Sequence, residues 1–298
     1  MSLTSSPAVP THPSGPVVVI GATGHLGRHV VEHLVARGVA PAAIIATGRS
    51  VERLADQASR GVDVRSIDRD DADALAQVLT PGARVLLISG TEPQRVAQHA
   101  RVIELAAAAE VERVVYTSGP RASTSSLDLL ADHAATERLL ADSTVPSVVV
   151  RNAWYVENYT DQAPVYREFG MASAAGEGTV SLALRREYAE AAVAALLDDA
   201  HLGATYELGG PAATHAEIAA AIGAALGIEL APAPVTEEQL AGILAGAGLP
   251  DPMPAWLAQV DSGIARGELL VPTDDLERLL GRAPLGLADA VAEALAQD

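Results

Sequence analysis

Cysteine and lysine are both absent from the 298-residue sequence. The lack of cysteine excludes disulfide bonds, thiolate nucleophiles and cysteine-ligated metals. All 20 basic residues are arginine, which excludes Schiff-base catalysis, the lysine of a Walker-type phosphate loop and a tyrosine–lysine proton relay. Any chemistry of this chain must therefore work without these groups.

Positive charge and long hydrophobic runs are also scarce. The 20 arginines stand against 38 acidic residues, a net charge of −18, so we expect neither nucleic acid nor a membrane surface as a partner. The longest apolar runs, such as residues 218–228, reach about half of the ~20 residues of a membrane span. No charged-then-apolar leader opens the chain, and residues 5–16 are rich in Ser, Pro and Thr, so we expect a cytoplasmic protein with a flexible tail over residues 1–15.

Short β-branched runs alternate with helical patterns through the first half of the chain. This alternation predicts right-handed βαβ units in a doubly wound parallel sheet, an α/β domain of the Rossmann type over residues 16–150. The expected strands are residues 16–20, 43–47, 62–67, 84–88, 111–117 and 147–150, and the expected helices are residues 25–37, 51–60, 71–79, 95–109 and 127–141.

The alternation ends after residue 150. Residues 151–178 are irregular and aromatic, residues 186–198 form a helical pattern, residues 205–208 resemble a strand, and the remainder is Ala/Leu-rich helix interrupted by Gly and Pro. We expect a smaller, mainly helical C-terminal substrate domain over residues 151–298. This division leaves open whether part of residues 180–210 returns to the first domain.

A glycine-rich turn lies between the first expected strand and the first expected helix. Its glycines permit a tight turn, close approach of backbone N–H groups to a pyrophosphate and close helix–sheet packing, and the helix N-terminus adds partial positive charge. A structural glycine turn is the alternative, but the strand–turn–helix context favours dinucleotide binding. The expected contacts are Gly21, Thr23, Gly24, His25, Leu26 and Gly27.

The end of the second strand indicates which dinucleotide is preferred. An NAD-preferring site places a carboxylate there for the ribose 2′-hydroxyl, whereas this chain has Thr47 and then Arg49, a guanidinium suited to a 2′-phosphate. We therefore expect NADP(H), the alternative being a solvated arginine. Asp68 is expected to meet the adenine amino group, unless Arg69 and Asp70 beside it form a surface pair. Ser89 and Gly90, after the fourth strand, are further expected cofactor contacts.

Five segments together resemble the NmrA-like atypical short-chain dehydrogenases, with type 2 NAD(P)H:quinone oxidoreductases the nearest subgroup and triphenylmethane-dye reductases close by. The resemblance covers nearly the whole chain beyond the tail. It implies a Rossmann-type domain, a small C-terminal substrate domain, a cleft between them and a homodimer. The segments are residues 21–27, 94–99, 115–118, 133–137 and 151–159.

The pattern departs from ordinary extended short-chain dehydrogenases at the catalytic pair. Aligning the family's glutamate with Glu137 places His133 at the lysine position and Leu129 at the tyrosine position. Ketone reduction generates an alkoxide, with a conjugate-acid pKa of about 15.7, whereas quinone reduction generates a phenolate-like anion near about 10. Forming the anion of the quinone product therefore costs roughly 7–8 kcal/mol less free energy than forming the alkoxide. We therefore expect an NADPH-dependent reductase that transfers hydride directly to a quinone or similar conjugated acceptor; cationic dyes are equally allowed.

Five of the nine aromatic residues lie within sixteen positions after the sixth strand, where doubly wound sheets bind ligands: Trp154, Tyr155, Tyr159, Tyr166 and Phe169. A flat acceptor suits such rings, although an aromatic core between domains is the alternative. The expected substrate contacts are Asn152, Trp154, Tyr155 and Asn158.

Three residues are candidates for the chemistry: His133, Ser118 and Tyr155. His133 is interpreted as a proton donor or ribose contact, or as a structural histidine, and Ser118 as a hydrogen-bond partner of nicotinamide or substrate. His25, His29 and His33 share one helical stripe, but His25 lies in the phosphate turn, so we expect no metal. Two alternatives remain: a non-catalytic NADP(H)-sensing regulator of the NmrA type, and a sugar-nucleotide epimerase, which the missing tyrosine base disfavours.

Overall fold

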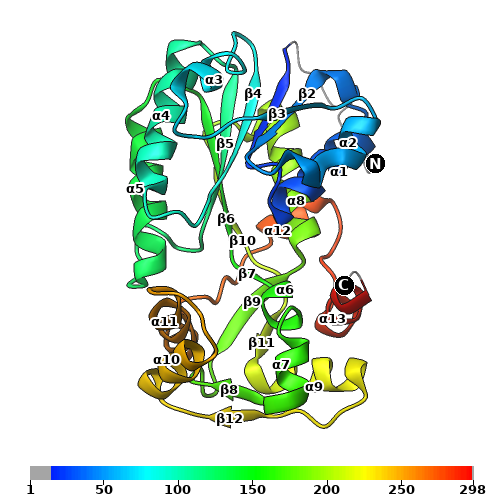
Figure 1. Cartoon of the computed structure of the whole chain (residues 1–298), viewed down its shortest axis with the longest axis vertical. Helices are drawn as coiled ribbons and strands as arrows, with labels where there is room; N and C mark the ends of the chain where they lie inside the picture. The colour runs from blue at the N-terminus through cyan, green and yellow to red at the C-terminus, as the bar shows by residue number, and fades with distance from the viewer. Residues whose placement is uncertain (1–14, 297–298) are drawn as a thin grey trace, which may run out of the picture.

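The computed structural model of the chain describes residues 15–296, so the tail expected over residues 1–15 lies almost wholly outside the described residues. Its upper part in Figure 1 is a seven-stranded sheet in the order β10-β6-β5-β4-β1-β2-β3, with every pair parallel. The predicted doubly wound parallel sheet is confirmed. The strands are β1 (Val17–Ile20), β2 (Ile44–Gly48), β3 (Asp63–Ser66), β4 (Arg84–Ile88), β5 (Arg113–Ser118), β6 (Ser147–Asn152) and β10 (Thr205–Leu208).

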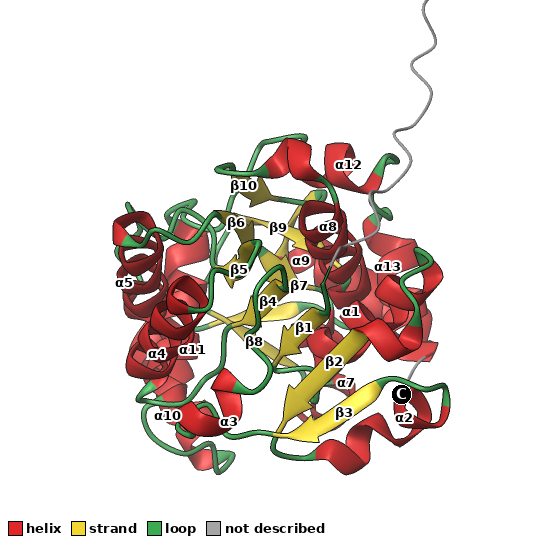
Figure 2. Ribbon diagram, turned by 90° about the horizontal axis from the view of Figure 1, so that it is seen from above, coloured by secondary structure: helices red, strands yellow, loops and turns green. Residues whose placement is uncertain are grey.

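Helices cover both faces of this sheet, as Figures 1 and 2 show. One face carries α3 (Ala72–Ala76), α4 (Arg95–Ala108) and α5 (Asp128–Asp142), and the other carries α1 (His25–Ala36), α8 (Arg185–Leu197) and α12 (Asp275–Leu280). Strands β1 and β4 are buried along their whole length because apolar helix faces pack on both sides of them. The sheet therefore has two apolar cores, one on each face.

The helix expected over residues 51–60 is different in the structure. It consists of a 3-10 turn, Val51–Leu54, followed by the short helix α2 (Ala55–Ser59), and two further 3-10 turns lie at Pro41–Ala43 and Asp199–His201. Only Leu54 and Gln57 of this segment are buried, so the segment has few apolar contacts that would require a longer helix. The helix expected over residues 71–79 is likewise shorter in the structure, where α3 ends at Ala76.

The lower part of Figure 1 is mainly helical and has its own core. Two small sheets, β11-β9-β7 and β12-β8, connect its helices. Its strands are β7 (Trp154–Tyr155), β8 (Met171–Ser173), β9 (Thr179–Ala183), β11 (Ala212–Thr214) and β12 (Pro232–Pro234), and its helices are α6 (Glu157–Thr160), α7 (Ala163–Phe169), α9 (His215–Leu226), α10 (Glu237–Gly246), α11 (Met253–Ala265) and α13 (Leu287–Ala296).

The chain crosses between the two parts more than once. After β9 it returns to the large sheet as α8, which packs on α1, and as β10, which pairs with β6; α12 then packs on α8. The domain boundary expected at residue 150 stays a prediction. The order of the large sheet reverses between β1 and β4, which is where doubly wound sheets form a ligand crevice.

Candidate active site

A cavity of about 640 Å³ opens at the carboxyl ends of the central strands. Its wall includes the expected cofactor contacts of the glycine turn and the residues expected for binding and chemistry elsewhere: Arg49, Asp68, Ser89, Gly90, Ser118, His133, Asn152, Trp154, Tyr155 and Asn158. These residues come from the ends of strands and the loops between the two parts of the molecule. Their individual roles stay predictions.

The glycine turn has the geometry that a dinucleotide requires. Gly21 has a φ of +95°, which favours glycine. A Cβ at Gly27 would collide with the Gly21 carbonyl oxygen, so this glycine allows α1 to approach the strand, whereas a Cβ at Gly24 meets only that oxygen, at 3.4 Å. Helix α1 begins at His25 with no side-chain cap and no acidic residue in its first turn. Its N-terminal N–H groups are thus available to a phosphate.

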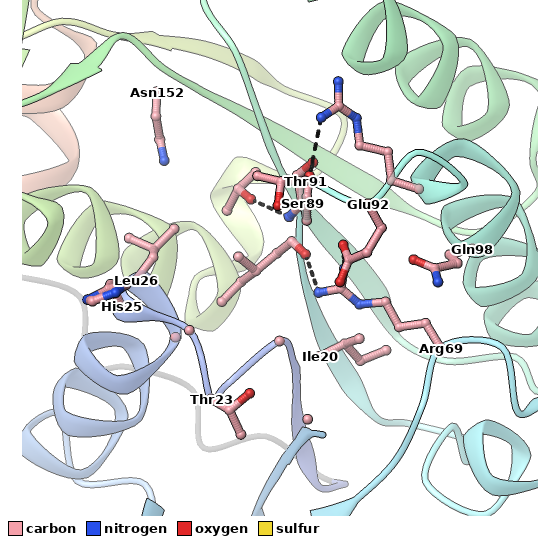
Figure 3. A pocket seen from close by; sticks show the side chains of 18 of the residues that line it. Ile20, Thr23, His25, Leu26, Arg69, Ser89, Thr91, Glu92, Gln98 and Asn152 are labelled. Carbon is pink, nitrogen blue, oxygen red and sulfur yellow. Dashed lines mark hydrogen bonds and ion pairs between the residues drawn. The ribbon is translucent and has the colours of Figure 1, made fainter. Parts of the chain in front are cut away.

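Three charged side chains form a network at the adenosine end of the predicted site. Arg49 Nη2 lies 2.5 Å from Glu92 Oε1, and the other oxygen of Glu92 lies 4.0 Å from Arg69 Nη1. Arg69 also donates to the Ile88 carbonyl at 2.7 Å, and Figure 3 shows it beside Glu92. Arg49 is 65% exposed and Arg69 only 13%. The network therefore adds Arg69 and Glu92 to the arginine that the sequence indicated at this end of the cavity.

Arg69 and Asp70 do not form the surface pair that the sequence allowed. The Asp70 carboxylate instead accepts hydrogen bonds from Gln98 and Arg101, while Arg69 turns into the cavity. Asp68 is exposed on the cavity wall and accepts from the backbone N–H of Asp70. Sequence reasoning missed Arg69 and Glu92 as site residues because they lie on separate loops with no shared motif.

His133 on α5 lines the cavity, and a buried tyrosine hydrogen-bonds the side of its ring that faces the core. The Tyr116 hydroxyl oxygen lies 2.9 Å from His133 Nδ1. Burial, with the Arg95 guanidinium adding to it, lowers the pKa of His133 to about 4, and burial raises the pKa of Tyr116 to about 12. At neutral pH His133 is therefore an uncharged imidazole, and its role as a proton donor, a ribose contact or a structural histidine stays a prediction. Tyr116 lies in one of the segments that carry the family resemblance, but nothing in the sequence indicated its contact with His133.

Ser118 belongs to a hydrogen-bonded network behind the cavity wall. Its hydroxyl donates to Glu137 Oε1 at 2.6 Å, and Arg151 binds both oxygens of the same carboxylate. Arg151 also pairs with Glu207 on β10 at 2.7 Å, and these two carboxylates raise its pKa. With its proton committed to Glu137, Ser118 can offer a ligand only its oxygen lone pairs.

The aromatic cluster divides into three groups in the structure. Trp154 and Tyr155 line the cavity, Tyr159 and Tyr166 pack in the C-terminal core, and Phe169 is 76% exposed. The two rings expected to contact the acceptor line the cavity, whereas Tyr159 and Tyr166 match the alternative of an aromatic core. Their helices α6 and α7 turn those rings away from the cavity mouth.

Two asparagines flank the aromatic wall. Asn152 donates from Nδ2 to the Tyr155 hydroxyl at 3.2 Å, and its buried Oδ1 has no hydrogen-bond partner among the described residues. Asn158 Oδ1 accepts from Arg185 at 3.4 Å. Figure 3 shows Asn152 directed into the cavity, and a buried amide oxygen without a partner is suited to a donor on a ligand.

Residues 15–296 contain neither a cluster of metal ligands nor a membrane-spanning helix. No group of three or more His, Asp or Glu side chains is placed there to hold a metal ion. No helix in the same range has the length and apolar character needed to cross a membrane.

Comparisons with known proteins agree with this geometry. A family profile described as NAD(P)H-binding matches residues 21–199. Quinone oxidoreductase 2 of Escherichia coli is 37% identical over 279 residues, which cover 93% of this chain and 97% of that protein. The crystal structure of the NADPH-dependent quinone oxidoreductase of E. coli complexed with NADPH has a TM-score of 0.88 at 36% identity and covers 93% of this chain and 99% of that chain.

A second solved structure is the triphenylmethane reductase of Citrobacter sp. complexed with NADP(H). It has a TM-score of 0.86 at 32% identity and covers 94% of this chain and 100% of that one. A curated relative from Aspergillus flavus, 29% identical over 180 residues (58% of each chain), is named an NmrA-like family domain-containing oxidoreductase. The resemblance found in the sequence is confirmed: the chain belongs to the NAD(P)H-binding, NmrA-like family of reductases.

Proposed function

We propose that this protein is an NADPH-dependent reductase that transfers hydride directly to a quinone or a similar conjugated acceptor. One observation carries the proposal: the cavity joins a dinucleotide turn to an aromatic wall, in a chain that has no lysine for a proton relay. The names of the relatives from E. coli and Citrobacter support both the cofactor and the acceptor class.

The residues present fit a dinucleotide. The turn from Gly21 to Gly27 and the N-terminus of α1 would hold the pyrophosphate, and Arg49, with Arg69 close by, would bind the 2′-phosphate. Asp68 would accept from adenine, and Ser89 and Gly90 would line the cofactor. When bound, the reduced nicotinamide supplies the hydride.

The acceptor end of the site provides neutral hydrogen-bonding groups and aromatic surface. Trp154 and Tyr155 would contact a flat ring, and the free Oδ1 of Asn152 would accept a hydrogen bond from a hydroxyl of the hydroquinone product, with Asn158 beside them. His133 stays uncharged, so no strong acid is available for an alkoxide. A phenolate-like product anion needs only hydrogen bonding, which is why the site favours quinones over ketones.

The regulatory alternative is not favoured, because the relatives that cover almost the whole chain are named as enzymes. The net charge of −18 supports the proposals that neither nucleic acid nor a membrane surface is a partner. A cytoplasmic location and a homodimer stay predictions.

The test is a paired steady-state assay of NADPH oxidation with benzoquinone and cyclohexanone. We expect turnover of the quinone and none of the ketone. Comparable rates with both substrates would show a proton relay that this proposal denies. NADPH binding without turnover of any quinone or cationic dye would instead support the regulator.

A further inference from the structure

A tyrosine and a histidine connect the sheet core to the cavity. Tyr116 on β5 is fully buried in the core between the sheet and helices α4 and α5, and its hydroxyl lies 2.9 Å from Nδ1 of His133 on α5. The other ring nitrogen of His133, Nε2, has no hydrogen-bond partner among the described residues, and the histidine lines the cavity. The imidazole is therefore fixed on its buried side and free on its open side.

The chemistry of the two groups decides which one donates. An imidazole nitrogen, with a conjugate-acid pKa of about 6.5, is a much stronger acceptor than a phenol oxygen, and a phenol of about 10 is a stronger acid than a neutral imidazole N–H. The Tyr116 hydroxyl should thus donate to Nδ1. In a neutral imidazole the proton then belongs to Nε2, because only one nitrogen carries it.

The surroundings of His133 keep the ring neutral. Arg95 on α4 lies nearby with its guanidinium bound to Asp132 and to the Leu129 carbonyl, while Glu137, one turn further along α5, is held by Arg151. His99 on α4 packs edge-on against Tyr116, with ring centroids 5.3 Å apart, and burial lowers the pKa of His99 to about 3. No carboxylate hydrogen-bonds His133 within the described residues, and the negative charge of Glu137, which favours an imidazolium, is outweighed by burial and by Arg95 in lowering the pKa of His133.

We propose that Tyr116 is a positioning residue that holds His133 in the tautomer with the proton on Nε2, so that this N–H donates a hydrogen bond to the oxyanion formed on the acceptor. The inference rests on the proposed reductase function and deepens it. Hydride delivers two electrons and one proton to the quinone, which leaves the hydroquinone monoanion, and water supplies the second proton. His133 donates a hydrogen bond without losing its proton, a role that a neutral imidazole can fill.

The tautomer can be observed without turnover. In ¹⁵N-histidine-labelled protein, assigned by the loss of one signal in His133→Ala, the shifts of His133 should report a protonated Nε2 and an unprotonated Nδ1. In Tyr116→Phe the signal should move toward a mixture of tautomers. A protonated Nδ1 in the wild-type protein would overturn the inference whatever the enzyme reduces.

A pair of acceptors gives the kinetic test. Quinone reduction creates an oxyanion, whereas hydride transfer to a cationic triphenylmethane dye neutralises a carbocation and creates none. Loss of one hydrogen bond should lower kcat for benzoquinone about three- to tenfold in Tyr116→Phe. The rate with the dye should be unchanged. Equal losses with both acceptors would indicate a merely structural role.

Two further variants make the assignment specific. If Tyr116 acts through His133, then Tyr116→Phe combined with His133→Ala should be no slower with benzoquinone than His133→Ala alone. The matched control is Tyr159→Phe, because Tyr159 makes the same 2.9 Å contact with a buried histidine, His215, away from the cavity. That variant should keep the wild-type ratio of the two rates.

The outcomes separate the two proposals. A wild-type protein that reduces neither acceptor refutes the reductase function, while the NMR result still decides the tautomer. A wild-type protein that reduces both, with additive effects of Tyr116→Phe and His133→Ala on benzoquinone, refutes the positioning role alone.

Discussion

Glu92 should weaken NADPH binding, so Glu92→Gln is expected to tighten it. In the structure this carboxylate holds Arg49 at 2.5 Å and lies 4.0 Å from Arg69, the two guanidinium groups available to a 2′-phosphate. The phosphate must displace Glu92 from Arg49 and then remain near its negative charge. The amide of glutamine fills the same volume without that charge.

Two contributions set the magnitude. The Arg49–Glu92 pair is partly exposed, so breaking it costs about 0–1 kcal/mol. A phosphate of charge about −1.5 to −2 at a distance on the order of 8 Å from a carboxylate, in a water-like medium, adds about 1 kcal/mol of repulsion. Their sum, about 1–2 kcal/mol, corresponds to an NADPH Kd about 5- to 30-fold lower in the variant.

Isothermal titration calorimetry of both cofactors provides the assay. NADH lacks the 2′-phosphate and should gain about twofold or less, and the gain for NADPH should shrink in about 0.5 M salt. The control is Glu104→Gln, which makes the same charge change at an exposed position on α4 outside the cavity. Equal tightening of NADPH and NADH, or weaker NADPH binding, would refute the placement of the phosphate between these arginines.

Three other substitutions test the rest of the site. Arg49→Ala should weaken NADPH binding by roughly 1.5–3 kcal/mol, the scale of a charge-assisted contact, while NADH titrations change little; equal losses would contradict the assignment. Gly24→Val should abolish dinucleotide binding while the circular dichroism stays native, because a Cβ at Gly24 contacts only the Gly21 carbonyl oxygen and otherwise faces the open turn. Micromolar NADPH affinity in this variant would contradict the assignment of the pyrophosphate to the glycine turn. Trp154→Ala should raise the benzoquinone KM about two- to tenfold, the scale of an aromatic pair, with kcat nearly unchanged; a kcat loss alone would place Trp154 elsewhere in the reaction.

The cofactor half of the site could be predicted because its determinants are contiguous. The turn from Gly21 to Gly27 carries the strand, the tight turn and the helix start in one short segment, and Arg49 follows the next strand directly. Parallel strands place their carboxyl ends at one edge of the sheet, so adjacency in space followed from the alternation alone.

The acceptor half depended on side-chain directions that periodicity does not determine. Tyr116 follows a run of valines on β5, and only the seating of α5 on the sheet brings His133 to its hydroxyl. Glu92 and Arg69 come from loops after different strands. The sequence left open whether the aromatic cluster binds a ligand or fills a core, and the structure divides it, because α6 and α7 place Tyr159 and Tyr166 in the C-terminal core.

A last prediction concerns stability in that C-terminal core, where Asp261 lies 3.8 Å from His215 Nδ1. Burial raises the pKa of Asp261 from 3.8 to about 6, and burial lowers the pKa of His215 from 6.5 to about 4. In the unfolded chain, between about pH 4 and 6, the histidine holds the one proton of this pair, whereas in the folded chain the aspartate holds it. The two shifts therefore oppose each other in the pH dependence of stability.

Asp261→Asn should separate the two contributions. A carboxyl group whose pKa is higher in the folded chain than in the unfolded chain stabilises the fold at pH values below its unfolded pKa. This stabilisation is lost as the pH rises to the folded pKa. The wild-type protein should therefore lose stability relative to the variant between about pH 4 and 6. The full shift corresponds to about 2–3 kcal/mol. Urea unfolding across this range should show the advantage of Asp261→Asn growing to that size and then levelling off. Asp289→Asn, at an exposed position on α13, should show no such trend. Parallel stability profiles for the wild type and Asp261→Asn would mean that the buried carboxyl stays ionised beside His215.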